Sequence, residues 1–215
     1  SMVAGETASK SLKMFAEMKD TAQPVFIKAY TSSEEMDVEG AIYTNHVNYL
    51  LDNNITPHLV KGFDFIQCSE NNETVLNKLK SILPESAPKL NAFTQTLNDY
   101  ERLSLIVTQQ IKNSITMKTH SENTSSGAER DSILFQLFYT LKAFEKIGFY
   151  HGDLHFNNIL LEKKPWKATY EYGGKIYQIV SPYTLKIFDF DKSLLVKDNT
   201  ALSPLTFQIS NEKKQ

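Results

Sequence analysis

The feature that most constrains the fold is a polar segment between a strong helix pattern and a short apolar run. Residues 149–158 follow no regular period, and residues 159–161 are typical of a strand. The preceding stretch, 129–147, has apolar residues at helical spacing, and Gly148 ends it. The stripe that we expect to be buried consists of Ile133, Leu134, Leu137, Phe138, Leu141 and Phe144. A loop held between a buried helix and a strand can direct its side chains into one cleft.

Polar side chains in and after this loop form a set suited to phosphoryl transfer. Asp153 lies five residues before Asn158, and a strand pattern at 184–188 ends at Asp189, with Asp191 two positions later. If the strands that begin after Asn158 and end before Asp189 pair, both side chains reach one metal. Their oxygen atoms suit Mg²⁺ rather than Zn²⁺. We therefore expect Asp153 to be a catalytic base, Asn158 to be catalytic and metal-binding, and Asp189 to be a metal ligand. Asp191 is a further candidate ligand, which either assists the metal or only fills its position in the segment.

The first half of the chain alternates strand and helix patterns. Residues 24–30, which include Lys28, are typical of a strand, and Ser32 and Glu35 have capping-box spacing for a helix that ends at 52–54. Strand signals return at 58–68 and 103–108. The stretches 69–101 and 118–127 are polar, and we interpret them as a surface insertion and as the edge between two lobes. The helix stripe expected to face inward is Ile42, Tyr43, His46, Tyr49 and Leu50.

The second half predicts one further hairpin. Apolar and polar residues alternate over 169–180 around Gly173 and Gly174, which are typical of a tight hairpin turn. Tyr170, Tyr172 and Tyr177 alternate on it and are expected to pack rather than to stack on a ligand. We expect the last ~20 residues to be frayed.

Composition limits the partners more than it identifies them. The 23 basic and 25 acidic side chains give a net charge of -2, which indicates neither a nucleic-acid partner nor a membrane surface. Cys68 is the only cysteine, so no internal disulfide forms, and no signal-type start or apolar run of spanning length is present. We expect an intracellular protein with a sizeable core.

In the loop around Asp153 and at the segment around Asp189, the sequence resembles the protein-kinase-like superfamily. The segment 151–158 looks like its catalytic loop, and 188–191 looks like its metal-binding motif. The resemblance implies an α+β fold with a small β-rich N-lobe, hinge and insertion over 1–117 and a shortened helical C-lobe over 118–215. It also implies that Lys28 pairs with Glu39 and steadies the phosphates of ATP. The hinge that would receive adenine consists of Thr108, Gln109, Gln110 and Ile111.

Two positions resemble atypical branches of this superfamily. His155 stands where ordinary serine/threonine kinases have lysine, and Asp191 replaces the glycine of the usual metal motif. The loop is similar to those of haspin-like kinases and of aminoglycoside and choline phosphotransferases, and the chain is most similar to kinases of giant DNA viruses, which implies a host cell or virion. His151 is interpreted as a brace for the loop and His155 as a residue near the acceptor or phosphate. Zinc binding by this pair is disfavoured because no third ligand lies near.

Two departures from the resemblance leave the function open among three readings. The only glycine before Lys28 is Gly5, so a glycine-rich phosphate turn is not evident, and only residues 192–215 follow Asp191. The first reading is an ATP- and Mg²⁺-dependent kinase that acts on a hydroxyl of protein serine or threonine. The second is a pseudokinase that binds nucleotide or a partner without turnover. The third is a phosphotransferase for small molecules such as amino alcohols or aminoglycosides.

Overall fold

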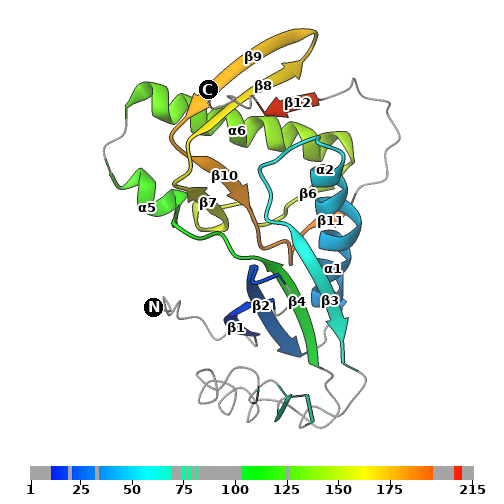
Figure 1. The fold of residues 1–215 in the computed structure, drawn as a ribbon. Coiled ribbons are helices and arrows are strands. Elements are labelled where there is room, and N and C mark those ends of the chain that lie inside the picture. Colours follow the sequence, from blue (N-terminus) through cyan, green and yellow to red (C-terminus); the bar gives the residue numbers. More distant parts are fainter. Residues whose placement is uncertain are drawn as a thin grey trace. The chain divides into compact units, whose positions relative to one another are not determined.

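The computed structural model describes a mixed α+β chain that forms two compact units (Figure 1). The first unit consists of Ser1–Gly40 with Gly62–Gln110, and the second of Ala41–Lys61 with Ile111–Gln215. The chain therefore passes between the units after Gly40, Lys61 and Gln110. The lobe edge expected at 117/118 stays a prediction. The residues described are 11–18, 21–31, 34–68, 74–75, 77–78, 81, 103–123, 126–195 and 206–209. Most of the expected insertion, 69–101, and of the expected frayed end lies outside them.

The first unit contains a four-stranded antiparallel sheet with the strand order β1-β2-β4-β3. The strands are β1 (Ser11–Glu17), β2 (Pro24–Thr31), β3 (Gly62–Gln67) and β4 (Leu103–Gln109). The predictions for β2 and β4 are confirmed, and the strand expected over 58–68 forms over Gly62–Gln67. Strand β1 was not predicted, although Leu12 and Met14 are buried and alternate with exposed neighbours. These two side chains pack with Ala29, Leu103 and Leu105 in the core of the unit.

The predicted helix before residue 52 is confirmed, but it is not regular throughout. It consists of α1 (Glu34–Ile42), a π-helical turn (Tyr43–Val47) and α2 (Asn48–Asp52), and Asn54 follows with a φ of 53°. Ile42, Tyr43 and Leu50 are buried as expected, whereas Tyr49 is 50% exposed. The wider π turn shifts the phase of the side chains, which explains why the stripe read at regular spacing was wrong at Tyr49. Ser32 and the side chain of Glu35 lie outside the described residues.

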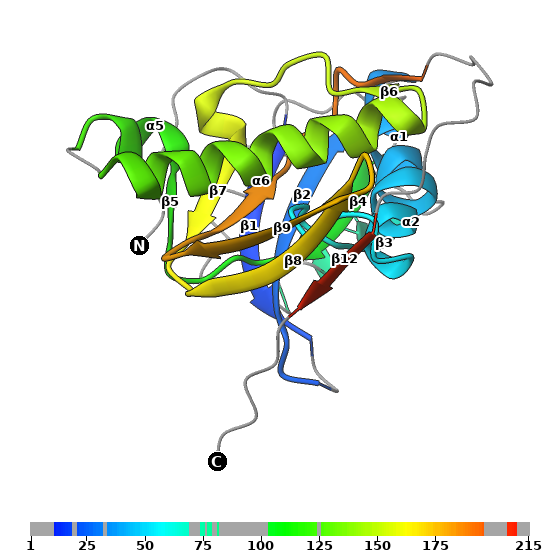
Figure 2. The same cartoon turned by 90° about the horizontal axis from the view of Figure 1, so that it is seen from above.

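The second unit contains, besides the π-helical turn and α2, one long helix and three small antiparallel sheets (Figure 2). The helix is α6 (Gly127–Lys146), and the sheets have the orders β10-β7-β5, β11-β6 and β12-β8-β9. The predicted hairpin is confirmed, with Gly173 and Gly174 in its turn at φ values of 59° and 72°. The remaining elements are β5 (Ser114–Thr116), α5 (Met117–Ser121), β6 (Phe149–Tyr150), a 3-10 turn (Phe156–Asn158), β7 (Ile159–Glu162), β8 (Trp166–Tyr172), β9 (Lys175–Ser181), β10 (Thr184–Ile187), β11 (Leu194–Leu195) and β12 (Thr206–Ile209).

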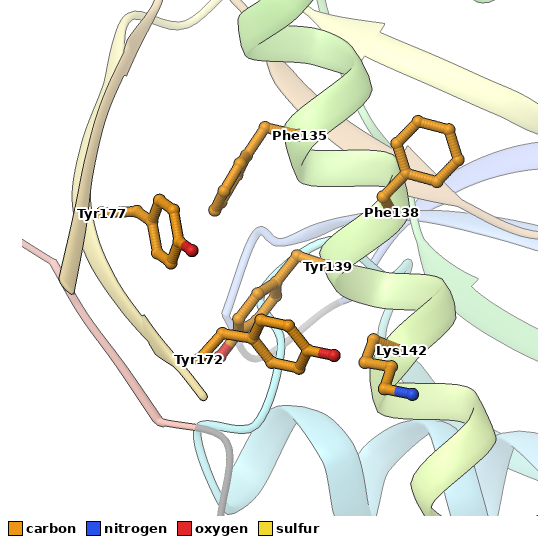
Figure 3. A pocket seen from close by; sticks show the side chains of 6 residues that line it. All are labelled: Phe135, Phe138, Tyr139, Lys142, Tyr172 and Tyr177. Carbon is orange, nitrogen blue, oxygen red and sulfur yellow. The ribbon is translucent and has the colours of Figure 1, made fainter. Parts of the chain in front are cut away.

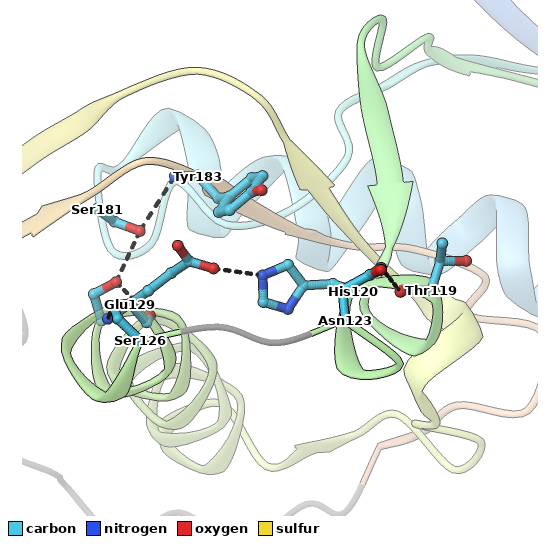
Figure 4. A network of polar contacts seen from close by, with 8 residues as sticks. Thr119, His120, Asn123, Ser126, Glu129, Ser181 and Tyr183 are labelled. Carbon is cyan, nitrogen blue, oxygen red and sulfur yellow. Dashed lines mark hydrogen bonds and ion pairs between the residues drawn. The ribbon is translucent and has the colours of Figure 1, made fainter.

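The polar stretch 118–127 is not simply a linker, because it contains most of α5 and the start of α6. Ser126 caps α6 by accepting a hydrogen bond from the backbone N–H of Glu129 at 3.2 Å. The Glu129 carboxylate in turn lies 2.7 Å from Nε2 of His120 on α5, as Figure 4 shows. This contact fixes α5 against the first turn of α6.

The buried face of α6 differs from the predicted stripe. Leu134 and Phe138 are 38% and 63% exposed, whereas Gln136 and Thr140 are completely buried. The Gln136 side chain accepts a hydrogen bond from Leu185 N at 2.9 Å and donates one to Tyr183 O at 3.1 Å. A glutamine whose amide is satisfied in this way is stable in a core. The predicted stripe is thus confirmed at Ile133, Leu137 and Phe144, which are buried, and wrong at Leu134 and Phe138.

Aromatic side chains line a pocket of about 320 Å³ (Figure 3). Its walls come from α6 and the β8–β9 hairpin and consist of Phe135, Phe138, Tyr139, Lys142, Tyr172 and Tyr177. Tyr170 lies beneath them, fully buried, with its ring centroid 5.0 Å from that of Phe135. The packing role expected for Tyr170 is confirmed, whereas Tyr172 is 43% exposed. Among the described residues, no helix has the length and apolarity needed to cross a bilayer.

Candidate active site

The loop at 151–158 is braced by His151, as the sequence suggested. The His151 Nε2–H donates to the carbonyl oxygen of Phe188 at 3.0 Å, and its ring lies 5.0 Å from that of Phe190. Burial lowers the pKa of His151, so the ring is neutral with its proton on Nε2. This hydrogen bond fixes the beginning of the loop to the end of β10.

Asn158 and Asp153 are joined inside the loop. The buried Asn158 amide donates a hydrogen bond from Nδ2 to the carbonyl oxygen of Asp153 at 3.1 Å. Asn158 ends a short 3-10 turn, and His155 caps the start of this turn by accepting a 3.2 Å hydrogen bond from Asn157 N at Nδ1. Since Nδ2 is used within the loop, the amide oxygen Oδ1 is the atom of Asn158 that can bind a cation.

The pairing that the sequence predicted between the two flanking strands is present. Strand β10 pairs with β7, with Ile187 opposite Ile159, and Phe188 N donates to Asn158 O at 3.2 Å. Asp189 therefore follows directly on a residue that is bonded to Asn158. Its φ of 67° is unfavourable for a residue with a side chain, by roughly 1 to 2 kcal/mol. Strain of this kind is common where a side chain has to be held in a functional position.

The segment after Asp189 is anchored by Phe190. This ring is fully buried and lies 5.2 Å from the ring of Tyr43 and 5.8 Å from that of Phe149. Asp191 follows and is partly buried. Lys192, which the sequence did not single out, places its Nζ 2.9 Å from Oδ2 of Asp153. Hydrogen bonding to Lys192 lowers the pKa of the Asp153 carboxyl below its usual value.

Lys28 and Glu39 form an ion pair in the first unit. Lys28 lies on β2, between β1 and β4, and its Nζ is 2.8 Å from Oε2 of Glu39 on α1. The two side chains are 9% and 2% exposed. A lysine on an interior strand with a buried carboxylate partner is not a solvated surface lysine. The pairing inferred from the resemblance is therefore present in the structure.

The segment expected to receive adenine begins in β4. Thr108 is buried in the strand, and Gln110 N donates to Pro24 O at 3.3 Å. Gln109 and Ile111 are partly buried, and the carbonyl oxygen of Ile111 accepts a hydrogen bond from Ser114 Oγ at 2.9 Å. Because the N–H of Gln110 is used by Pro24, other backbone groups of 108–111 would have to recognise adenine.

The donor set in the second unit fits a magnesium–nucleotide site. Within the described part of the chain, no three histidine, cysteine, aspartate or glutamate side chains are grouped to hold a metal by themselves. An amide oxygen and one or two carboxylates are, however, the ligands that Mg²⁺ takes when phosphate oxygens and water complete its shell. Asn158 and Asp189 meet that requirement, and the sequence adds Asp191.

Comparison with known proteins establishes the class of fold first. A crystal structure of the Rad53 kinase domain and SCD2 superposes with a TM-score of 0.51 and 14% sequence identity, covering 86% of this chain. The chain spans about half of that protein, since 49% of its length is covered. The fold is that of the protein kinases, with a β-rich N-terminal part and a helical part.

A comparison with family models gives a partial match. Residues 75–173, just under half of the chain, match the model of the lipopolysaccharide kinase (Kdo/WaaP) family. The match includes Asp153 and Asn158 but ends before Asp189. No curated protein matches the chain in a direct sequence comparison. The family match and the kinase fold together support a phosphotransferase.

Proposed function

We propose that the protein is an ATP- and Mg²⁺-dependent phosphotransferase that transfers the γ-phosphoryl group to a hydroxyl. The observation that carries this proposal is the joined loop in the second unit. There, Asn158 holds the backbone of Asp153, and the Asn158 carbonyl oxygen accepts from the residue before Asp189. A base and two hard ligands are thereby fixed in one place, which is most of what phosphoryl transfer requires of a protein.

Each residue of the set has a distinct role in this proposal. Asp153 orients the acceptor hydroxyl and accepts its proton, which its low pKa allows because the carboxylate is ionised at neutral pH. Asn158 and Asp189 bind Mg²⁺, with Asp191 beside them. Lys28, held by Glu39, steadies the phosphates. When bound, Mg²⁺ neutralises phosphate charge and aligns the leaving group.

The acceptor hydroxyl has two candidate sources. A serine or threonine of a protein is the first, and it follows from the resemblance to protein kinases. A sugar hydroxyl is the second, and it is favoured by the match of residues 75–173 to a lipopolysaccharide kinase family. The match adds sugars to the amino alcohols and aminoglycosides already considered. The resemblance to kinases of giant DNA viruses stays a prediction about the source of the protein.

A pseudokinase is the alternative from another class, and the hairpin between β1 and β2 favours it. The sequence between β1 and β2, residues 18–23, contains no glycine, and Ala22 adopts a φ of 52°. Phosphate-covering turns in kinases use glycine so that the backbone can approach the phosphates closely. A side chain here would weaken such contacts, which predicts slower turnover or none.

Transfer of labelled phosphate from ATP to a panel of acceptors tests the proposal. The panel contains a protein mixture, lipopolysaccharide-type oligosaccharides, and amino alcohols with aminoglycosides, each with Mg²⁺ or EDTA. Asp153→Asn serves as the matched blank. Mg²⁺-dependent labelling of one class, absent with the variant, would identify the acceptor. Binding of ATP with no labelling of any class by either protein would instead indicate a pseudokinase.

A further inference from the structure

The pair formed by Lys192 and Asp153 is unusual for its position and its exposure. Lys192 Nζ lies 2.9 Å from Oδ2 of Asp153, and the two side chains are 64% and 33% exposed. Asp153 is the group that would contact the acceptor oxygen, so this lysine touches the centre of the proposed reaction. An exposed ion pair contributes little to stability, which leaves its position to be explained by another role.

The backbone of Lys192 is held far more firmly than its side chain. A Cβ on Gly152 would lie 1.9 Å from the carbonyl oxygen of Lys192, so the loop and the 190–195 segment are in direct contact. Ser193 donates from its N–H to Phe190 O at 3.1 Å and from Oγ to His151 O at 3.0 Å. Strand β11 then pairs with β6. Lys192 thus has an anchored backbone and an exposed ammonium group that contacts Asp153.

The charge balance of phosphoryl transfer requires a cation at this place. The transferred group carries negative charge on its equatorial oxygens, and it approaches the same acceptor oxygen that the Asp153 carboxylate contacts. The Asp153 carboxylate and the transferred phosphoryl group are both negatively charged and repel each other, and a cation between them reduces this repulsion. The loop itself, 151–158, contains no lysine or arginine. His155 stands at the position after Asp-Leu, and its Nδ1 is used to cap the turn.

We propose that Lys192 is a catalytic residue that exchanges partners during transfer, an inference that rests on the proposed function. Before transfer, its ammonium group holds the Asp153 carboxylate in place. As the bond between the acceptor oxygen and phosphorus forms, the bond between phosphorus and the bridging oxygen breaks, and its electron pair remains on the ADP oxygen. The acceptor proton passes to Asp153, whose charge falls, and Lys192 then pairs with the phosphoryl oxygens.

Substitutions at Lys192 test this role against a matched surface pair. Lys192→Met removes the charge at similar size, and Lys192→Arg keeps it. Lys61→Met is the control, because Lys61 lies 2.9 Å from Asp52 in another exposed pair of the same unit. Steady-state phosphotransfer, Mg²⁺–ATP binding and thermal melting are measured on all three variants. Lys192→Gln provides a second neutral variant in case Lys192→Met does not fold.

The expected result is a loss in kcat without a loss in nucleotide affinity. Removing one group that stabilises transition-state charge lowers kcat about 100-fold to 1000-fold, and a KM for ATP within about 3-fold of wild type would accompany it. Arginine should recover at least a tenth of wild-type kcat, and Lys61→Met should match wild type. A kcat within about 3-fold of wild type in the neutral variants would overturn the role, as would a loss that follows melting.

The outcome also separates this inference from the proposed function. If wild type transfers phosphate, Asp153→Asn does not, and Lys192→Met does, then only the role of Lys192 fails. If wild type labels no acceptor, the proposed function fails and the role of Lys192 fails with it.

Discussion

Two of the lysine–carboxylate pairs among the described residues have nearly the same length and opposite surroundings. Lys28 and Glu39 lie 2.8 Å apart with side chains 9% and 2% exposed, whereas Lys192 and Asp153 lie 2.9 Å apart with side chains 64% and 33% exposed. Burial makes the first pair difficult to separate, since each charge loses its solvent. Water makes the second pair easy to exchange. In the proposed reaction, Lys28 is the fixed cation at the nucleotide, and Lys192 is the cation that exchanges partners.

The largest expected effect on stability comes from breaking the buried pair. Glu39→Gln leaves Lys28 as a buried charge without its carboxylate, which we expect to lower the free energy of unfolding by about 3 to 5 kcal/mol. Denaturant titration measures this loss, and Lys192→Met in the exposed pair should show no measurable change in the same titration. Equal effects at the two pairs would refute the contrast.

A double substitution separates stability from function at the buried pair. Lys28→Met with Glu39→Leu removes both charges and replaces them with apolar groups of similar volume. We expect unfolding free energy within about 1 to 2 kcal/mol of wild type, because no buried charge remains unpaired. Binding of Mg²⁺–ATP should still be weakened about 10-fold or more, equivalent to at least about 1.4 kcal/mol. Wild-type ATP binding in this variant would show that Lys28 is only structural.

The close contact between Gly152 and the backbone of Lys192, next to the exposed pair, can be tested by substitution of Gly152. Gly152→Ala introduces a Cβ 1.9 Å from Lys192 O at a φ of +76°, whereas Gly173→Ala at a φ of +59° meets no atom within 4 Å. Both variants pay the conformational penalty, roughly 1 to 2 kcal/mol, and only the first adds overpacking of about 1 to 3 kcal/mol. The melting temperature and the phosphotransfer rate should both be lower for Gly152→Ala than for Gly173→Ala. Equal melting of the two variants would contradict the contact.

The stability of the second unit should depend on pH because it contains a buried histidine, His58. His58 is fully buried, with Nδ1 donating to Leu185 O at 3.2 Å and Nε2 accepting from Tyr170 Oη at 2.8 Å. Burial lowers the pKa of His58 from 6.5 to about 3. The unfolded chain therefore binds the proton first, and the stability that is complete above pH 6.5 is lost as pH falls toward 3.

The pH effect has a direct measurement. Between pH 7 and pH 5 we expect the free energy of unfolding to fall by about 2 kcal/mol through His58, at about 1.4 kcal/mol per pH unit below 6.5. His58→Asn should be less stable at pH 7 but should lose less on acidification. The lowered pKa of His151 also reduces stability in acid, in wild type and in His58→Asn alike. The contribution of His58 is therefore the difference between the losses of unfolding free energy in wild type and in His58→Asn. Parallel pH profiles would refute the assignment to His58.

The smallest expected effect concerns the hairpin beside Lys28. Ala22 has a φ of 52°, so Ala22→Gly should raise the free energy of unfolding by up to about 1 kcal/mol. Chemical denaturation measures this, and Ala16→Gly in strand β1 is the control that should destabilise instead. A loss of stability in Ala22→Gly would contradict the positive φ.

Local motifs allowed the second unit to be predicted well. The order of helix, loop and strand around Asp153 and Asn158 depends on residues close in sequence, and the strand before Asp189 has its own apolar pattern. Glycines at 148, 173 and 174 marked a helix end and a hairpin turn that the structure confirms. The roles of the site residues stay predictions; within the second unit the structure joins Asp153, Asn158 and Phe188, the residue before Asp189.

Features that depend on tertiary contacts were missed. Gln136 is held on the buried face of α6 because it donates a hydrogen bond to Tyr183 O and accepts one from Leu185 N, and a hydrophobicity pattern does not predict such bonds. The contact of Lys192 with Asp153 joins residues 39 positions apart, and only its place after Asp191 could have drawn attention to it. Strand β1 was missed for another reason, since the alternation of Leu12 and Met14 was present but short.

The most direct test of the central claim is transfer of labelled γ-phosphate from ATP by wild type and Asp153→Asn, with Mg²⁺–ATP binding measured on the same preparations. The account predicts Mg²⁺-dependent transfer by wild type, reduced about 100-fold to 10,000-fold in the variant, with both proteins binding the nucleotide to a similar degree. Transfer by Asp153→Asn at the wild-type rate would contradict the assignment of Asp153 as the catalytic base.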